Sequence, residues 1–106
     1  MKFIVFFVGG EPTKEEKDEH MLEWKKWIES LGNTSVEYNN GYPYGQKAVI
    51  VSSKGTNTYK PSGNDGSGYM LIRAESIDDA AEVMGSAPSI VNGGKIILRE
   101  LMDKKM

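Results

Sequence analysis

The sequence predicts an α+β fold in which one four-stranded antiparallel sheet carries two helices on one face. Its 106 residues suffice for a single domain, residues 1–106, and its 39% hydrophobic and 26% charged residues are typical of a globular protein. Strand and helix patterns follow in the order strand, helix, strand, strand, helix, strand. That order is the ferredoxin-like βαββαβ pattern, in which right-handed crossovers place both helices on the same side.

The first unit is a buried strand followed by an amphipathic helix. KFIVFFV (Lys2–Val8) is apolar at consecutive positions, which predicts a central strand buried on both faces. Thr13 and Glu16 have capping-box spacing, so the helix is expected to begin there and to end at Gly32. Its apolar side is expected to contain Met21, Trp24, Trp27, Ile28 and Leu31.

The middle of the chain carries weaker signals. Asn33–Gln46 contains a tight-turn signal and is expected to form an irregular loop, with at most a short hairpin. KAVIVSS (Lys47–Ser53) predicts the second strand of the sheet, and Thr58–Lys60 a short returning extension. Lys60–Gly68 is rich in Gly, Pro, Ser and Asn, which indicates a loop.

The second half repeats the strand-and-helix order. Gly68–Ala74 predicts the third strand, with Tyr69 and Arg73 on the face opposite Met70. Ser76 is the expected cap of a short helix that ends near Gly85. Lys95–Leu101 predicts the last strand.

With both helices on one side, the other face of the sheet is left bare although it carries apolar side chains. Exposed apolar faces of this size are normally covered. A second copy packed face to face is the simplest cover, so the sequence predicts a homodimer through the open sheet face.

Composition excludes several classes of function. A net charge of −2 gives no basic field, so no nucleic-acid partner is expected. The chain has no cysteine and one histidine, which excludes disulfides, thiolate chemistry, iron–sulfur clusters and multi-histidine zinc sites. Neither a metal site nor a cofactor is expected. No segment is long enough to span a membrane, and a cytoplasmic location is expected.

His20 is the candidate catalytic residue. It lies at the border of the apolar side of the first helix, with Glu16 and Glu23 on the same flank. Carboxylates so placed could orient the imidazole for general acid or base catalysis. The alternative is a helix-surface histidine with a hydrogen-bonded nitrogen.

Five further residues are candidates for ligand binding: Trp24, Tyr42, Tyr44, Tyr69 and Arg73. Trp24 is expected in a cleft between helix and sheet, and the loop tyrosines could cover that cleft as a lid. Ordinary packing is the alternative for these aromatic residues. Arg73 is expected on the dimer-facing side of the sheet, where it needs a carboxylate from the second copy or an acidic ligand.

Several stretches resemble the YCII-related family, and within it the DGPF-type branch: FIVFFVGGE, HMLEWKKWIESLG, VIVSSKG, GYMLIRAESIDDAAEVMGSAP and GGKIILREL. The resemblance implies a dimeric α+β barrel and a helix histidine that works with an aspartate. His20 matches that histidine, and no residue here matches the aspartate. Asp65-Gly66 is followed by Ser67-Gly68 instead of Pro-Phe, so the family signature is not carried over.

Two functions remain open. The first is a non-catalytic protein that binds a small organic ligand in the helix–sheet cleft, which the missing signature and the missing aspartate favour. The alternative is a small enzyme of isomerase or lyase type that uses His20 as general acid or base.

Overall fold

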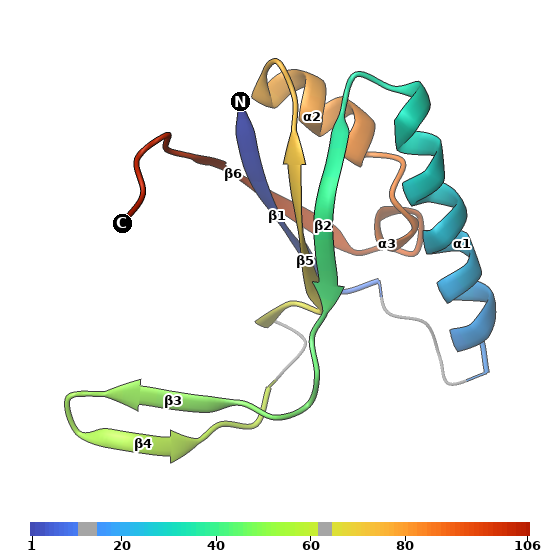
Figure 1. Cartoon of the computed structure of the whole chain (residues 1–106). Coiled ribbons are helices and arrows are strands. Elements are labelled where there is room, and N and C mark those ends of the chain that lie inside the picture. The colour runs from blue at the N-terminus through green and yellow to red at the C-terminus, as the bar shows by residue number, and fades with distance from the viewer. Residues whose placement is uncertain (11–14, 62–64) are drawn as a thin grey trace.

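The computed structural model describes residues 1–10, 15–61 and 65–106, and within them it has the predicted α+β architecture (Figure 1). The elements follow in this order: β1 (Lys2–Val8), α1 (Lys17–Ser30), the 3-10 helix η1 (Leu31–Asn33), β2 (Glu37–Pro43), β3 (Val49–Ser52), β4 (Gly55–Thr58), β5 (Gly68–Arg73), α2 (Ile77–Met84), α3 (Pro88–Val91) and β6 (Lys95–Leu101). The main sheet is antiparallel, with strand order β2-β5-β1-β6, which is the ferredoxin-like order. The helices cover one face of this sheet.

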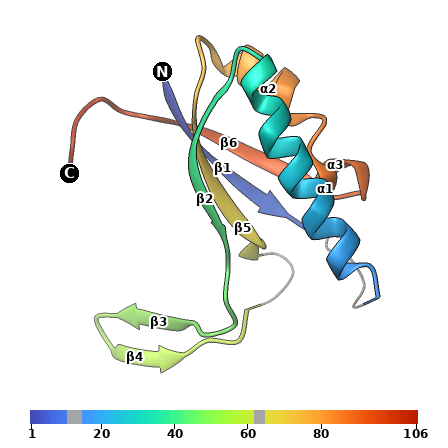
Figure 2. The same cartoon turned by 45° about the vertical axis from the view of Figure 1, so that its right-hand side comes forward.

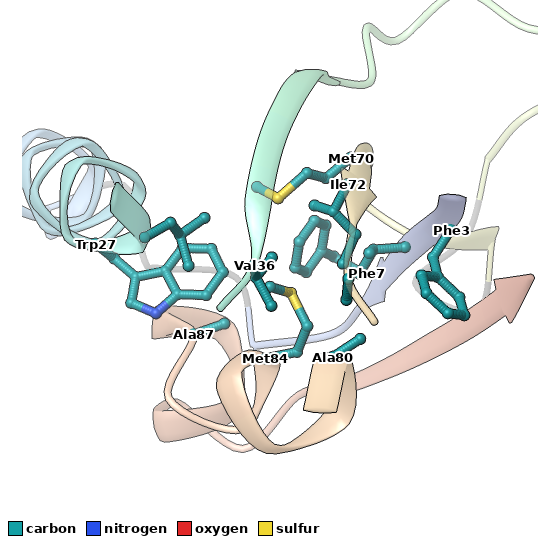
Figure 3. Packing of buried hydrophobic residues seen from close by; sticks show 12 residues of the cluster. Phe3, Phe7, Trp27, Val36, Met70, Ile72, Ala80, Met84 and Ala87 are labelled. Atoms are coloured by element: carbon teal, nitrogen blue, oxygen red, sulfur yellow. The ribbon is translucent and has the colours of Figure 1, made fainter. Parts of the chain in front are cut away.

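The core lies between this sheet and the helices (Figure 3). Strand β1 contributes Phe3, Val5 and Phe7, all buried, α1 contributes Trp27, and η1 contributes Leu31. The intervening residues of β1 on the other face of the sheet are half-buried, so the prediction that β1 is buried on both faces is wrong for the single chain. One face of the central strand therefore remains open.

The second strand of the sheet is β2, and the prediction of an irregular loop over residues 33–46 is wrong there. Strand β2 pairs with β5 through a bulge between Tyr38 and Asn40. Gly41 allows this pairing, because a Cβ atom at that position would lie 2.6 Å from the Tyr69 carbonyl oxygen. Polar residues and glycine give β2 little intrinsic strand propensity, so its pairing depends on the tertiary contact with β5.

The strand predicted over Lys47–Ser53 exists only as β3, and it lies outside the main sheet. It pairs with β4 in a separate two-stranded hairpin, which we call the arm (residues 49–58). The arm projects away from the main sheet on the side opposite the helices, as both views show (Figures 1 and 2). Strand β4 also begins earlier than the returning extension expected at Thr58.

The helix predictions are confirmed in part. Ser76 caps α2, because its Oγ accepts a hydrogen bond from the Asp79 backbone N–H at 3.1 Å. The first predicted cap, Thr13, lies outside the described residues, and the described helix α1 begins at Lys17. Met21 was expected on the apolar side of this helix but is 67% exposed, so the buried side begins at Trp24. No helix among the described residues is long and apolar enough to cross a membrane.

Candidate functional site

Both ring nitrogens of His20 are engaged. The Trp24 indole N–H donates to His20 Nε2 at 2.7 Å, and the side-chain amide of Asn92 lies 3.3 Å from Nδ1. Since Nε2 accepts a hydrogen bond, the neutral ring carries its proton on Nδ1. The Asn92 side chain then accepts a hydrogen bond from Nδ1–H when its amide is turned so that Oδ1, in place of Nδ2, faces the ring. The histidine thus links α1 to the turn before β6.

Trp24 connects this histidine to the core. Its ring packs edge-on against Phe7 of β1, with centroids 4.9 Å apart, and against Trp27, with centroids 5.4 Å apart. Trp27 is anchored separately, because its indole N–H donates to Ser86 Oγ at 2.9 Å. The lone pair of His20 Nε2 therefore positions a half-buried tryptophan.

A small polar hollow of about 170 Å³ lies beside His20. It is lined by His20, Glu16, Glu19, Glu23 and Asn92. The predicted placement of two glutamates on the flank of His20 is confirmed, and Glu19 and Asn92 were missed. Asn92 is 72 residues away along the chain, so no local pattern could have identified it. Among the described residues, no group of side chains could hold a metal ion.

Three of the predicted ligand residues lie together on the open face of the sheet. Tyr44 and Tyr69 are stacked, with ring centroids 6.3 Å apart and planes at 28°. Tyr42 lies at the same centroid distance from Tyr69, tilted by 45°. These three residues form the tyrosine cluster. It is on the opposite side of the sheet from Trp24, so the tyrosine lid over a helix–sheet cleft is not formed.

The tyrosine cluster continues across the sheet as an aromatic and aliphatic row. Cross-strand pairing places Tyr42 beside Tyr69, then Phe6, then Ile97. A neighbouring row on this face ends in Arg99 of β6. This open sheet face thus combines an apolar centre with a basic side chain at the β6 edge.

Arg73 lies on the same face but at its other end. It is exposed in the single chain, and its cross-strand partners are Lys2 and Glu37. It lies four positions beyond Tyr69 along β5, so it is far from the tyrosine cluster. The structure therefore divides the predicted residues into three places: His20 with Trp24, the tyrosine cluster, and Arg73.

A second hollow, of about 320 Å³, lies between the helices and the sheet at the β6 edge. Its lining is mostly apolar: Ala81, Met84, Gly85, Ile90, Gly94, Lys95, Ile96 and Leu98. We call it the α2–β6 hollow. None of the predicted site residues lines it, because it is formed by the consecutive elements α2, α3 and β6 at the end of the chain.

The base of the arm is held by hydrogen bonds. The Tyr59 backbone N–H donates to the Ala48 carbonyl at 3.0 Å, and the Tyr44 N–H donates to the Ser67 carbonyl at 2.8 Å. The Tyr59 hydroxyl donates to Asp65 Oδ1 at 2.5 Å. This hydrogen bond, with burial and the Asp65 charge as smaller causes, raises the pKa of Tyr59.

No family model matches the sequence, and no curated protein matches it. Among solved structures, the chain is similar to 5-chloro-2-hydroxyhydroquinone dehydrochlorinase from Burkholderia phenoliruptrix AC1100, in complex with 2,5-dihydroxybenzoquinone. The TM-score is 0.61 with 14% sequence identity, covering 96% of this chain and 94% of that chain. At this identity the likeness shows the fold alone, which agrees with the ferredoxin-like α+β architecture described above.

Proposed function

We propose that this chain is a homodimeric protein that binds a small, flat organic acid at the tyrosine cluster, without catalysis. The observation that carries the proposal is the convergence of three tyrosine rings on a sheet face that no helix or strand of the described residues covers. Membership of the YCII-related family and a cytoplasmic location belong to the same proposal, and they rest on the sequence resemblance and on the absence of cysteine.

The accessible surface supports a homodimer. A compact monomer of 11.8 kDa exposes roughly 5,900 Å². This chain exposes 8199 Å², so the excess is roughly 2,300 Å². Intimate homodimers bury about 1,000–2,500 Å² on each partner, which matches the excess. The radius of gyration, 15.2 Å, also exceeds the roughly 13 Å of a compact chain of this length.

The chemistry of the open sheet face supports a flat acidic ligand. Aromatic rings bind flat molecules by stacking, and tyrosine hydroxyls add hydrogen bonds to oxygen atoms. Arg99 lies on the neighbouring row of the same face, where it favours an anion. The similar dehydrochlorinase binds 2,5-dihydroxybenzoquinone, a flat ring with several oxygen atoms, which is a ligand of this class.

The helix–sheet side offers less for such a ligand. The α2–β6 hollow has the size of a small ligand site but presents mainly apolar side chains. A ligand in the helix–sheet cleft that the sequence predicts would occupy this hollow. It would lack the converging polar groups that fix the orientation of a bound molecule.

The test is a nuclear magnetic resonance titration of the dimer with 2,5-dihydroxybenzoquinone and with 4-hydroxybenzoate. We expect the largest resonance shifts in β5 around Tyr69. Tyr44→Ala should raise the dissociation constant of the ligand by up to roughly tenfold, because one stacking ring is lost. Tyr59→Ala is the matched control, because Tyr59 lies outside the cluster and should leave binding unchanged. Shifts confined to Ala81, Ile90 and Ile96 would instead place the ligand in the α2–β6 hollow.

The second candidate is an enzyme that uses His20 as general acid or base. It is favoured by the half-buried imidazole in a hollow with three glutamates, and by the enzymatic activity of a protein with this fold. The occupied Nε2 lone pair opposes it, because a general base must first release the Trp24 N–H. Chloride release from 5-chloro-2-hydroxyhydroquinone by the wild-type chain, lost in His20→Phe, would establish this alternative.

A further inference from the structure

The arm has one face that requires a partner. Cross-strand pairing places four β-branched residues on this face: Val49, Val51, Thr56 and Thr58. The two valines are 61% and 74% exposed, and every residue of both strands is exposed. An isolated two-stranded hairpin is marginally stable in water. The β-branched face is therefore suited to packing against another surface.

Within the described part of the chain, nothing provides that surface. The arm leaves the main sheet from β2, which is one edge of the strand order β2-β5-β1-β6. The α2–β6 hollow lies at the opposite edge, and the arm points away from the helices (Figures 1 and 2). A contact between the arm and this hollow must therefore join two copies.

The arm and the α2–β6 hollow complement each other in shape, and helix α2, which forms one wall of the hollow, is acidic where the arm is basic. The hollow exposes an apolar concavity of about 320 Å³, and the arm presents an apolar ridge. The chain from 47 to 60 contains three lysines and no acidic residue, whereas the chain from 75 to 82 contains four acidic residues. The charged residue in the lining itself is Lys95, at the start of β6. Asp78 shares the side of α2 that carries Ala81 and Gly85, three and seven residues later.

We propose that the arm of each copy docks in the α2–β6 hollow of a second copy, with Val49 and Val51 against its apolar lining. In a two-fold dimer this contact occurs twice, once at each outer edge. It brings the β2 edge of one copy to the β6 edge of the other and encloses both open sheet faces, including the tyrosine clusters. The inference rests on the homodimer proposed above and specifies how that homodimer is held.

The first test compares the dimer dissociation constants of two arm variants by sedimentation equilibrium. Val51→Asp places a charge on the β-branched face and should weaken the dimer at least about tenfold. Asn57→Asp places the same charge on the opposite face of the same hairpin, since Asn57 pairs with Ile50, and should change the constant little. Because both sites are exposed in the single chain, both variants should keep the wild-type circular dichroism spectrum.

The second test uses the absence of cysteine from the chain. Mixed dimers of Val51→Cys and Ala81→Cys copies should form a disulfide between the arm of one copy and the hollow of the other. The matched pair, Asn57→Cys with Ala81→Cys, should not, because Asn57 is on the far face of the arm. Equal cross-linking by both pairs would overturn the proposal.

The outcomes separate this inference from the proposed function. A wild-type dimer whose dissociation constant is unaffected by Val51→Asp, and which forms no Val51–Ala81 cross-link, would overturn the arm contact and leave the homodimer standing. A wild-type chain that stays monomeric at all concentrations would overturn the homodimer and the arm contact together. Weakening by Val51→Asp with specific cross-linking supports both.

Discussion

Replacing His20 by Phe tests whether this histidine holds Trp24 in place. Phe has a helix propensity close to that of His, and its ring can keep the edge contact with Trp24 at a centroid distance of 6.1 Å. The substitution therefore removes mainly two hydrogen bonds, from the Trp24 indole at 2.7 Å and to Asn92 at 3.3 Å.

The expected cost follows from these two contacts. A net hydrogen bond contributes about 0.5–1.5 kcal/mol to the free energy of unfolding. The hydrogen bond from Trp24 is short and half-buried. The Asn92 contact is longer and exposed, so its contribution lies at the lower end of that energy range. We expect a loss of about 1–1.5 kcal/mol, which lowers the melting temperature by roughly 4–10 °C.

Urea unfolding of His20→Phe, Trp24→Phe and the double variant measures the pair. If the indole bonds to the imidazole, the double variant costs less than the sum of the single variants. The Trp24 indole resonance should move in His20→Phe, because phenylalanine has no acceptor nitrogen. The Trp27 indole, bonded to Ser86, is the internal control. Additive costs and an unmoved Trp24 resonance would refute the assignment.

Three further predictions concern the fold and the arm. Phe3→Ala, at a fully buried position of β1, should lower the free energy of unfolding by about 3–5 kcal/mol in urea titrations. Gly10→Ala should destabilise more than Gly93→Ala in thermal melts: both have positive φ, but a Cβ at Gly10 would lie 2.2 Å from a backbone oxygen of α3, while nothing lies within 4 Å at Gly93. An equal loss would contradict the close approach. Asp65→Asn should lower the pKa of Tyr59 toward its ordinary value in an ultraviolet titration. Because the folded pKa is raised, the stabilising contribution is present below the ordinary tyrosine pKa and is lost as the pH rises through the folded value.

Local patterns in the sequence were enough for the elements that bury their own side chains. Lys2–Val8 and Lys95–Leu101 were placed at the residues where β1 and β6 lie, and Ser76 caps α2 as expected. The hydrophobic periodicity and the capping residues of such segments predict their secondary structure, because these local features do not depend on distant contacts. Once these elements are known in order, the crossover rule leaves the ferredoxin-like arrangement as the consistent topology.

The second strand shows where local patterns mislead. The residues of β3 (Val49–Ser52) have high strand propensity, whereas β2 contains Asn39, Asn40 and Gly41, yet β2 joins the main sheet. The hydrogen-bonded pairing with β5 holds β2 in the sheet, and a bulge accommodates its residues of low strand propensity. The residues with stronger propensity are left to form the arm.

Local sequence patterns suffice for the fold class, the central strand and the position of His20 at the border of the buried helix side. The contacts of its ring nitrogens with Trp24 and Asn92 depend on the folded arrangement, as does the placement of Tyr42 and Tyr44 on the opposite face of the sheet from that histidine. The physical reason is that a side chain's partners depend on which strands pair and on which face each residue then occupies. Strand pairing is a long-range choice, and shifting it by one residue moves every side chain to the other face.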